Sequence, residues 1–383
     1  MDMKKKVGIL TYHSSVNYGA YLQAYSLAKA INEKAALDAE IIDYTPLKAK
    51  LFYLSKVAIS LRGGHFIDIL KQYLVFKKVL KLLPLSKRSI ISGRKRWIKR
   101  FNKKYTAIIV GSDEVLNAGN SKIRSFPNIY WLSDEVKVTK LSYAGSANRS
   151  NYQKLNSADK AFIKSVFNGY EYIGVRDLYT RDQVLSIDSM LNTRLNCDPT
   201  FLVDFNNEFS NIREQIRNRL SQMTEKPVIA LMTRDNKLGQ RIREHFTDRY
   251  FYLAVYYPNS AADCFFSDMT PFEWAVSFPH YACCITQLYH GTIFCIKNRL
   301  PFIGVDCNPQ YDGRPSKISD LLVRSNLKEN YFNLRSENHS DKSMLRQLEQ
   351  NIRHPQIEKM QKAEGEQIKL FKQFELEFDK LMP

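Results

Sequence analysis

The chain has few cysteines for its length and no long apolar run, and both absences narrow what it can be. Six cysteines occur among 383 residues, and none forms a Cys-x-x-Cys pair or a zinc-finger spacing. We therefore expect buried, reduced thiols and no metal site. No stretch approaches the ~20 apolar residues that a transmembrane helix needs. The apolar run after the basic start covers only residues 7–10, which is too short for a signal peptide. We expect a cytoplasmic protein, with any membrane contact peripheral and at the inner face.

Acidic residues are scarce in one segment. The net charge is +18, and residues 48–104 hold 17 Lys or Arg against a single acid, Asp68. Leucines, isoleucines and aromatic residues lie between these basic residues at helical spacing. A basic amphipathic helix suits the surface of an anionic membrane, but an insertion that packs its apolar side on its own domain has the same pattern. The segment leaves both interpretations open. The chain has no helix-turn-helix, zinc-finger or RNA-binding signature, so we expect no nucleic-acid partner.

Short apolar runs alternate with helical patterns along the rest of the chain. Strands are predicted at residues 7–10, 40–44, 106–110, 281–286 and 301–305, and in the stretches "KVTKLSYAGSAN", "EYIGVRD" and "PVIALM". Repetition of strand, polar turn and helix predicts parallel sheets covered by helices. The polar composition around residues 204–224 marks a boundary. We predict an α/β protein with two Rossmann-like domains. Residues 1–205 form the first, with a basic helical insertion at about 48–104, and residues 225–383 form the second, which ends in a packing helix.

The first polar loop, "HSSVNYG", lies between the strand at 7–10 and a helix predicted at 18–30. Ligands of parallel sheets bind at loops that follow the carboxyl ends of strands, and a helix N-terminus offers unpaired N–H groups there. Gly19 would allow a ligand to approach the backbone. Asn17 or a serine can equally cap the helix, but the loop supplies more polar side chains than a cap needs, His13 among them. We predict a ligand-binding loop.

Two later stretches also bring polar residues to strand ends. In "IVGSDEVLN", Asp113 and Asn117 could orient sugar hydroxyls, and Asp113 could act as a base. A capping role for Ser112 or Asp113 is the alternative. In "TQLYHGTIF", His290 precedes a glycine at the start of a helix predicted at 293–297. A histidine there can contact an anion held by backbone N–H groups and can exchange a proton near neutral pH.

Together these stretches resemble the polysaccharide pyruvyl transferase family. The segments that carry the resemblance occur in the family's order over about residues 6–325: "GILTYHSSVNYGAYLQAYSL", "IVGSDEVLN", "LSYAGSAN", "GVRD", "CDPTFLV", "MTPFEWAVSFPHYACCITQLYHGTIFCIKNRLPFI" and "SKISDLL". The resemblance implies two Rossmann-like domains with a cleft between them, as in type-B glycosyltransferases. It also implies that phosphoenolpyruvate, a co-substrate, donates its pyruvyl group to a sugar diol of a capsule or exopolysaccharide precursor as a cyclic ketal, with no cofactor.

The resemblance also suggests roles for residues. His290 and Asp113 would be catalytic. The predicted donor-binding residues are Arg234, Arg176, Gly291, Thr292 and Lys317. The predicted acceptor-binding residues are His13, Asn17, Tyr18, Gly19 and Asn117. An ion pair with Asp177 or Asp198 is the alternative for Arg176, and simple packing is the alternative for Tyr18. A polyprenyl-pyrophosphate-linked acceptor at the cytoplasmic membrane face would give the basic insertion a purpose.

The segment before His290 departs from the family pattern. Members commonly carry S-R-x-H-G or D-S-F-H-G, whereas this chain has "QLYHG", and G-S-D-Q-V-W-N appears as "GSDEVLN". Either a cation elsewhere, such as Arg234 or Lys317, replaces the missing arginine, or the donor differs. Two alternatives therefore stay open. One is a nucleotide-sugar glycosyltransferase or epimerase on the same fold, with Glu273 as the suggestive ribose ligand. The other is a binding protein that keeps the fold without the chemistry.

Overall fold

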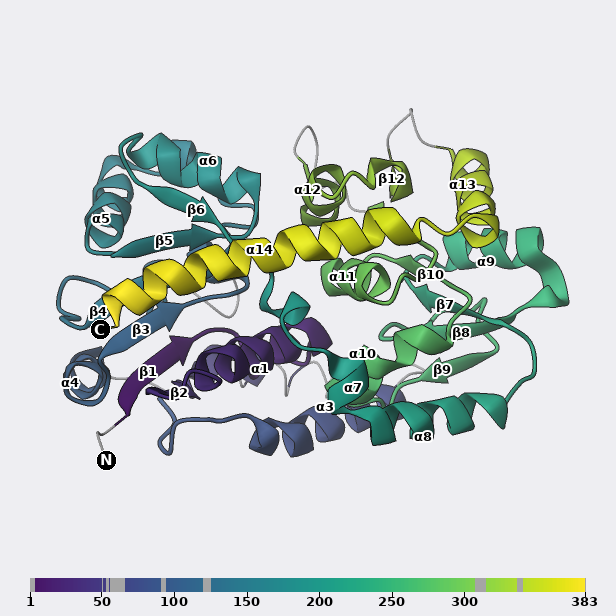
Figure 1. The fold of residues 1–383 in the computed structure, drawn as a ribbon, viewed down its shortest axis with the longest axis horizontal. Coiled ribbons are helices and arrows are strands. Elements are labelled where there is room, and N and C mark those ends of the chain that lie inside the picture. Colours follow the sequence, from purple (N-terminus) through teal and green to yellow (C-terminus); the bar gives the residue numbers. More distant parts are fainter. Residues whose placement is uncertain are drawn as a thin grey trace. The chain divides into compact units, whose positions relative to one another are not determined.

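The computed structural model describes residues 4–49, 51–52, 55, 66–90, 94–119, 125–306, 315–335 and 340–382. The chain divides into two compact units, Met1–Val203 with Gln367–Pro383 and Asp204–Glu366. Each unit contains one six-stranded sheet (Figure 1). Cys307 and parts of the predicted basic insertion lie outside the described residues. Among the helices of the described ranges, none is both long enough and apolar enough to cross a membrane.

The sheet of the first unit is parallel throughout and has the strand order β2-β1-β3-β4-β5-β6. Its strands are β1 (Lys5–Leu10), β2 (Leu37–Ile41), β3 (Ala107–Val110), β4 (Thr139–Gly145), β5 (Tyr172–Val175) and β6 (Thr193–Leu195). Its helices are α1 (Tyr18–Asn32), α3 (Phe66–Val79), α4 (Arg94–Lys104), α5 (Ser157–Asn168) and α6 (Leu178–Ile187). All four residues of β3 are buried, as expected for an apolar strand in the middle of a covered parallel sheet.

The second unit repeats the design with the strand order β12-β11-β10-β7-β8-β9, again parallel. Its strands are β7 (Val228–Met232), β8 (Phe251–Val255), β9 (Cys264–Phe266), β10 (Cys283–Thr286), β11 (Phe302–Asp306) and β12 (Tyr331–Asn333). Its helices are α7 (Phe205–Glu208), α8 (Ser210–Ser221), α9 (Asn236–Phe246), α10 (Pro271–Ser277), α11 (Tyr289–Lys297), α12 (Lys317–Arg324), α13 (Asp341–Arg353) and the start of α14 (Ile357–Leu381).

The strand orders place a switch point in each sheet. In the first unit β1 lies between β2 and β3, so the chain turns in opposite directions on either side of the gap between β1 and β3. In the second unit the same reversal occurs between β7 and β10. Loops that leave the carboxyl ends of two such strands diverge and leave a crevice that ligands occupy. The predicted polar loops after residues 10, 110, 232 and 286 are the loops that leave these four strands.

The unit boundaries differ from the predicted domains of 1–205 and 225–383. Residues 204–224 belong to the second unit, and the last residues of the chain, Gln367–Pro383, belong to the first. The reason is the apolar stripe of α14. Phe374 is fully buried, with its ring centre 4.6 Å from that of Tyr143 on β4 and 5.2 Å from that of Tyr172 on β5. The predicted packing helix thus completes the core of the first unit.

Candidate active site

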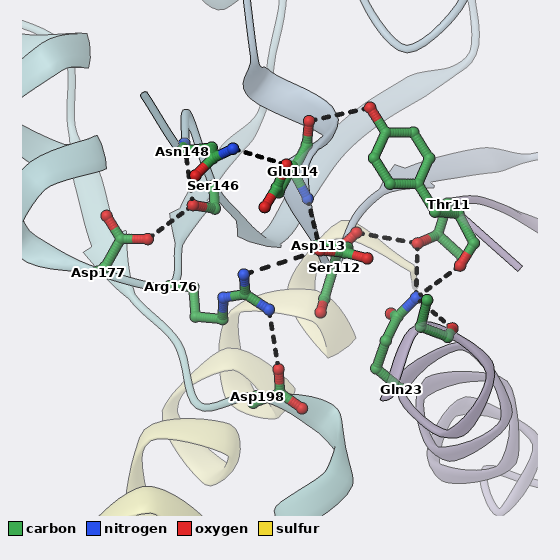
Figure 2. A network of polar contacts seen from close by, with 12 residues as sticks. Thr11, Gln23, Ser112, Asp113, Glu114, Ser146, Asn148, Arg176, Asp177 and Asp198 are labelled. Atoms are coloured by element: carbon green, nitrogen blue, oxygen red, sulfur yellow. Dashed lines mark hydrogen bonds and ion pairs between the residues drawn. The ribbon is translucent and has the colours of Figure 1, made fainter. Parts of the chain in front are cut away.

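Polar groups meet at the switch point of the first sheet. The hydroxyl of Thr11, directly after β1, donates to the carbonyl oxygen of Ser112, which follows β3, at 2.9 Å. Gln23 on α1 donates through Nε2 to Thr11 Oγ1, also at 2.9 Å. Figure 2 shows these three residues beside Asp113 and Arg176. The two strand-end loops predicted to bind ligands are therefore joined by direct hydrogen bonds.

Two buried polar atoms of this cluster have no hydrogen-bond partner among the described residues. They are Ser112 Oγ and Gln23 Oε1. Buried polar atoms in native proteins are nearly always paired with protein or ordered water. These two atoms therefore keep hydrogen-bonding capacity for a water or a ligand hydroxyl.

Asp113 and Arg176 lie together at the same edge. One guanidinium nitrogen of Arg176 lies 3.0 Å from Asp198, and another lies 3.8 Å from Asp113 (Figure 2). Arg176 is only 2% exposed, and Asp113 takes a φ of 76°, which is uncommon outside glycine. The predicted alternative for Arg176, an ion pair with Asp198, is present in the structure. Because the guanidinium is buried between carboxylates, it orients Asp113 and is not presented as an open carboxylate clamp.

Asn117 is used within its own loop. Its side-chain oxygen accepts from Ser150 Oγ at 2.7 Å and from the backbone N–H of Gly119 at 2.8 Å. Asp113 caps the short turn that leads to Asn117, since its Oδ1 accepts from the N–H of Glu114 at 2.9 Å. The predicted sugar contact of Asn117 stays a prediction, with the amide oxygen already committed to the loop.

Three predicted acceptor residues lie at the start of α1. Asn17 is the N-cap, with its side chain accepting from the N–H of Ala20 at 3.2 Å, as the capping alternative requires. Tyr18 is fully buried and its ring stacks on Phe76 of α3 at 5.2 Å. This burial corrects the prediction that Tyr18 stacks on a sugar, because no face of its ring is open. Gly19 is also buried, inside the first turn of the helix.

His13 lies in a pocket of the first unit with a volume of about 260 Å³. Its Nε2 is 3.2 Å from Oδ1 of Asp43, and its Nδ1 is 3.3 Å from the carbonyl oxygen of Thr11. Both neighbours are acceptors, so both contacts are hydrogen bonds only when the imidazole carries two protons. The other pocket residues come from the β1 and β2 loops and from α3 and the turn after it: Ser14, Val16, Thr45, Tyr73, Phe76, Lys77, Leu80 and Leu85.

A cation lies at the switch point of the second sheet. Arg234 follows β7, and its backbone N–H donates at 3.1 Å to the side chain of Gln287, which follows the neighbouring strand β10. The guanidinium carbon lies 4.2 Å from the centre of the Tyr257 ring, beyond β8. Burial raises the pKa of the Tyr257 hydroxyl, and Arg234 offsets part of that increase. The ring thus supports an exposed guanidinium at the sheet edge.

His290 lies in the first turn of α11, which begins at Tyr289 rather than at residue 293 as predicted. The helix starts early because the N–H of Leu288 donates to Thr286 Oγ1 at 3.0 Å, which closes the turn after β10. No side chain of the described residues caps α11. Its first N–H groups and the positive end of its dipole are therefore available to an anion beside His290.

The packing of the fold explains the two residues that follow His290. A Cβ on Gly291 would lie 2.4 Å from Thr286 Oγ1, so only glycine fits there. Thr292 is fully buried, and its hydroxyl donates back to the carbonyl oxygen of Leu288 at 3.2 Å. This corrects the prediction that the Thr292 hydroxyl contacts phosphate. Lys317 is the first residue of α12, at the edge where β11, the neighbour of β10, ends.

Each unit thus holds part of the predicted site. Asp113, Arg176 and the α1 loop lie in the first unit, whereas Arg234 and His290 lie in the second. The prediction missed Gln23 and Asp43. Asp43 had a usable signal, since it is an acid near the carboxyl end of the predicted strand at 40–44, and His13 follows the strand at 7–10. Gln23 had none, because a glutamine inside a helix pattern does not indicate a buried polar contact.

Solved structures with the same fold cover nearly the whole chain. A glycosyltransferase from Rickettsia africae matches with a TM-score of 0.55 at 12% identity, over 99% of this chain and 99% of that one. HepE from Anabaena in complex with UDP matches with a TM-score of 0.55 at 7% identity, over 98% and 100%. The UDP-GlcNAc 2-epimerase from Neisseria meningitidis bound to UDP-GlcNAc matches with a TM-score of 0.53 at 9% identity, over 94% of each chain. At these identities the likeness concerns the fold, which is that of type-B glycosyltransferases.

The family assignment comes from the sequence. No curated protein matches the chain. The family model for polysaccharide pyruvyl transferase matches residues 17–309, which include β3, the switch point of the second sheet and His290. The chain therefore belongs to the polysaccharide pyruvyl transferase family and is a transferase of polysaccharide biosynthesis.

Proposed function

We propose that the protein transfers the pyruvyl group of phosphoenolpyruvate to two hydroxyls of a sugar in a capsule or exopolysaccharide precursor. The products are a cyclic ketal and inorganic phosphate. The observation that carries the proposal is the contact between Arg234 and Gln287 at the second switch point. This hydrogen bond joins the backbone of Arg234 to the loop that leads into His290 and the uncapped start of α11, so both loops leave the same edge of the sheet. Phosphoenolpyruvate carries a phosphate and a carboxylate, and this edge offers the groups that bind such anions.

The proposed chemistry needs proton transfers, and we assign the first of them to His290. A proton adds to the methylene carbon of the enol, and one sugar hydroxyl oxygen adds to the neighbouring carbon and loses its proton. The bond from that carbon to the phosphate oxygen then breaks. The second hydroxyl takes the vacated place, and its proton leaves with phosphate. His290 delivers the proton to the methylene carbon, a role suited to an imidazole near neutral pH. Asp113 takes the proton of the first hydroxyl.

Arg234 and the first N–H groups of α11 hold the phosphate as its negative charge grows. Electrostatic stabilisation of a leaving group is strongest when the donors are fixed beforehand. The stacking of Arg234 on Tyr257 and the hydrogen bond from its backbone to Gln287 fix this part of the site. In this proposal Arg234, which follows the neighbouring strand β7, takes the place of the arginine that is missing before His290. Lys317 is a second cation for the donor carboxylate.

The acceptor sugar belongs in this proposal to the first unit. The pocket around His13 presents a carboxylate, three hydroxyls and a lysine beside aromatic and aliphatic side chains. Sugar sites combine such hydrogen-bonding groups with apolar surface. Asp113, oriented by Arg176, is the base for the hydroxyl that attacks first. Neither a metal nor an organic cofactor takes part.

Glu273, the residue that suggested a nucleotide-sugar substrate, has a structural role in the fold. The carboxylate of Glu273 accepts from the N–H of Thr270 at 2.6 Å, and Thr270 Oγ1 accepts from the N–H of Glu273 at 3.1 Å. This reciprocal pair is a capping box at the start of α10. The acid therefore has a structural role that explains its presence without a ribose.

Phosphate release from phosphoenolpyruvate tests the proposal. The assay uses a panel of nitrophenyl and lipid-linked glycosides and compares wild type with His290→Ala and with His354→Ala, an exposed histidine after α13. We expect acceptor-dependent release that His290→Ala reduces at least about 100-fold and His354→Ala leaves unchanged. The proposal that phosphoenolpyruvate is the donor would be refuted by two results together. They are no phosphate release with any acceptor, and a thermal shift caused by a nucleotide sugar but not by phosphoenolpyruvate.

A further inference from the structure

Helix α3 and the turn after it present a face on which apolar and basic side chains alternate. Ile67 and Leu74 are 65% and 56% exposed, and Leu82 in the following turn is 62% exposed. Lys71, Lys78 and Lys81 are exposed as well. Positions 67, 71, 74 and 78 are spaced by four, three and four residues, so their side chains project from one side of the helix. We call these six residues the α3 outer stripe.

The other sides of α3 pack against α1 or line the pocket around His13. Phe76 and Val79 are buried against α1, where the Phe76 ring stacks on Tyr18 and the carbonyl oxygen of Val79 accepts from the Tyr21 hydroxyl at 2.8 Å. Tyr73 and Lys77 line the pocket around His13. Packing and pocket thus account for two sides of the helix. The outer stripe is required for neither.

Exposed isoleucine and leucine side chains next to lysines match one kind of partner. Residues 66–90 carry six Lys or Arg and one acid, Asp68. An anionic bilayer offers phosphate groups for the lysines and acyl chains for the apolar residues in the same surface. A nucleic acid offers the phosphates without an apolar phase, so it would leave Ile67 and Leu74 in water.

We infer that the α3 outer stripe binds the surface of an anionic lipid membrane, with the helix axis in the membrane plane. The lysines lie at the headgroups, and Ile67, Leu74 and Leu82 enter the acyl boundary. This surface goes beyond the proposed transferase activity and does not depend on it. Because the helix also lines the pocket, a bound membrane lies close to the proposed acceptor site.

Co-sedimentation with vesicles tests the inference. Wild type is compared on phosphatidylglycerol-containing and pure phosphatidylcholine vesicles at low salt, and we expect binding to the anionic vesicles that weakens as salt rises. The triple variant Lys71→Gln, Lys78→Gln, Lys81→Gln should bind about 100-fold more weakly, from the loss of three lysine contacts. The triple variant Ile67→Gln, Leu74→Gln, Leu82→Gln should also lose most of its binding.

Matched controls lie on α14. The variant Lys362→Gln, Lys369→Gln, Lys372→Gln removes the same charge from exposed positions, and we expect its binding to stay within about two-fold of wild type. Leu74→Trp should show a blue shift of its emission with anionic vesicles, whereas Leu376→Trp, at an equally exposed leucine, should not. The tryptophan readout does not require that the triple variants fold.

Four outcomes would overturn the inference. Wild type could fail to bind anionic vesicles, or could bind neutral vesicles equally well. The stripe variants could bind anionic vesicles as strongly as wild type. Finally, wild type could bind RNA or self-associate through the stripe, with both lost in the stripe variants, and show no binding to vesicles. Phosphate release with a soluble acceptor is measured in parallel. Its failure would count against the proposed activity and leave the membrane result standing.

Discussion

The imidazole Nε2 of His13 lies 3.2 Å from the carboxylate of Asp43, and the two residues follow neighbouring strands of the first sheet. The proposed acceptor pocket depends on this pair. Asp43→Asn should raise the KM for the acceptor at least about ten-fold, because a charge-assisted hydrogen bond to His13 is lost. The KM for phosphoenolpyruvate should not change. Steady-state phosphate release at varied acceptor concentration measures the effect, and Asp182→Asn, at an exposed aspartate of α6, is the control. A raised KM for both substrates would contradict the assignment.

Arg234 should govern binding of the donor. Arg234→Gln removes the cation from the second switch point and should raise the KM for phosphoenolpyruvate about 10- to 100-fold, with the acceptor KM unchanged. The thermal shift caused by phosphoenolpyruvate should disappear in the same variant. Arg217→Gln, which breaks the exposed pair with Glu214, is the matched control variant. Unaltered donor affinity in Arg234→Gln would exclude this residue from the site.

Gly111 holds the first switch point together. Its φ is 126°, and a Cβ there would lie 2.0 Å from the carbonyl oxygen of Tyr143. Gly111→Ala should lower the free energy of unfolding by about 3 kcal/mol or more, since neither backbone can yield cheaply. Gly365→Ala on α14, where an added Cβ meets nothing within 4 Å, should instead raise it by about 0.5–1 kcal/mol. Urea unfolding measures the free energy of unfolding of both variants. Changes of the same sign and size would show that the close contact at Gly111 does not determine its stability effect.

Glu40 gives a prediction about pH. Burial raises the pKa of the Glu40 carboxyl, but hydrogen bonds from Lys104 and Tyr105 and the charges of Lys104 and Lys6 outweigh it, so the pKa lies below its usual 4.5. A carboxyl with a lowered folded pKa stabilises the fold above the unfolded value, and this contribution is lost as the pH falls through the folded pKa.

Glu40→Gln should therefore lower the free energy of unfolding by about 1–3 kcal/mol at pH 7. The difference in free energy of unfolding between variant and wild type should become smaller below about pH 4.5. Urea melts at pH 7 and at about pH 3 measure this difference, with Glu33→Gln, at a 68% exposed side chain, as the control. A difference that is constant over this range would mean that Glu40 stabilises by packing and not by its charge.

Phe374 tests the membership of α14 in the first unit. Phe374→Ala should destabilise that unit by about 3–5 kcal/mol, because the fully buried ring contacts Tyr143 and Tyr172. Leu376→Ala, two residues later and 66% exposed, should be nearly neutral. Hydrogen exchange of β4 and β5 should rise in Phe374→Ala alone. Protection that stays unchanged in these strands would place the helix outside the core of the first unit.

Local pattern was enough to predict the elements that position the site. The strands β1, β3, β7 and β10 are short apolar runs followed by polar loops, and burial on both faces of a parallel sheet demands such runs. Helix α1 begins where the polar loop offers Asn17 as a cap. The ordered set of motifs also led to the family that the match over residues 17–309 shows. Strands β6, β8, β9 and β12 were not predicted from the sequence. β8 is an apolar run like those of the predicted strands and was missed, whereas β6, β9 and β12 have only three residues each.

The sequence by itself determined the fold class, the family and the loops that carry His13, Asp113 and His290, because these depend on residue order and apolar spacing. The tertiary structure decided which residues those loops meet. Strand order places β3 beside β1 although α1, β2 and the basic segment lie between them in the chain, so Thr11 meets Ser112. It likewise pairs Arg176 with Asp198, stacks Tyr18 on Phe76, and packs Phe374 against Tyr143 of β4. Contacts between residues so far apart are set by how the sheet and its helices pack, which no local pattern records.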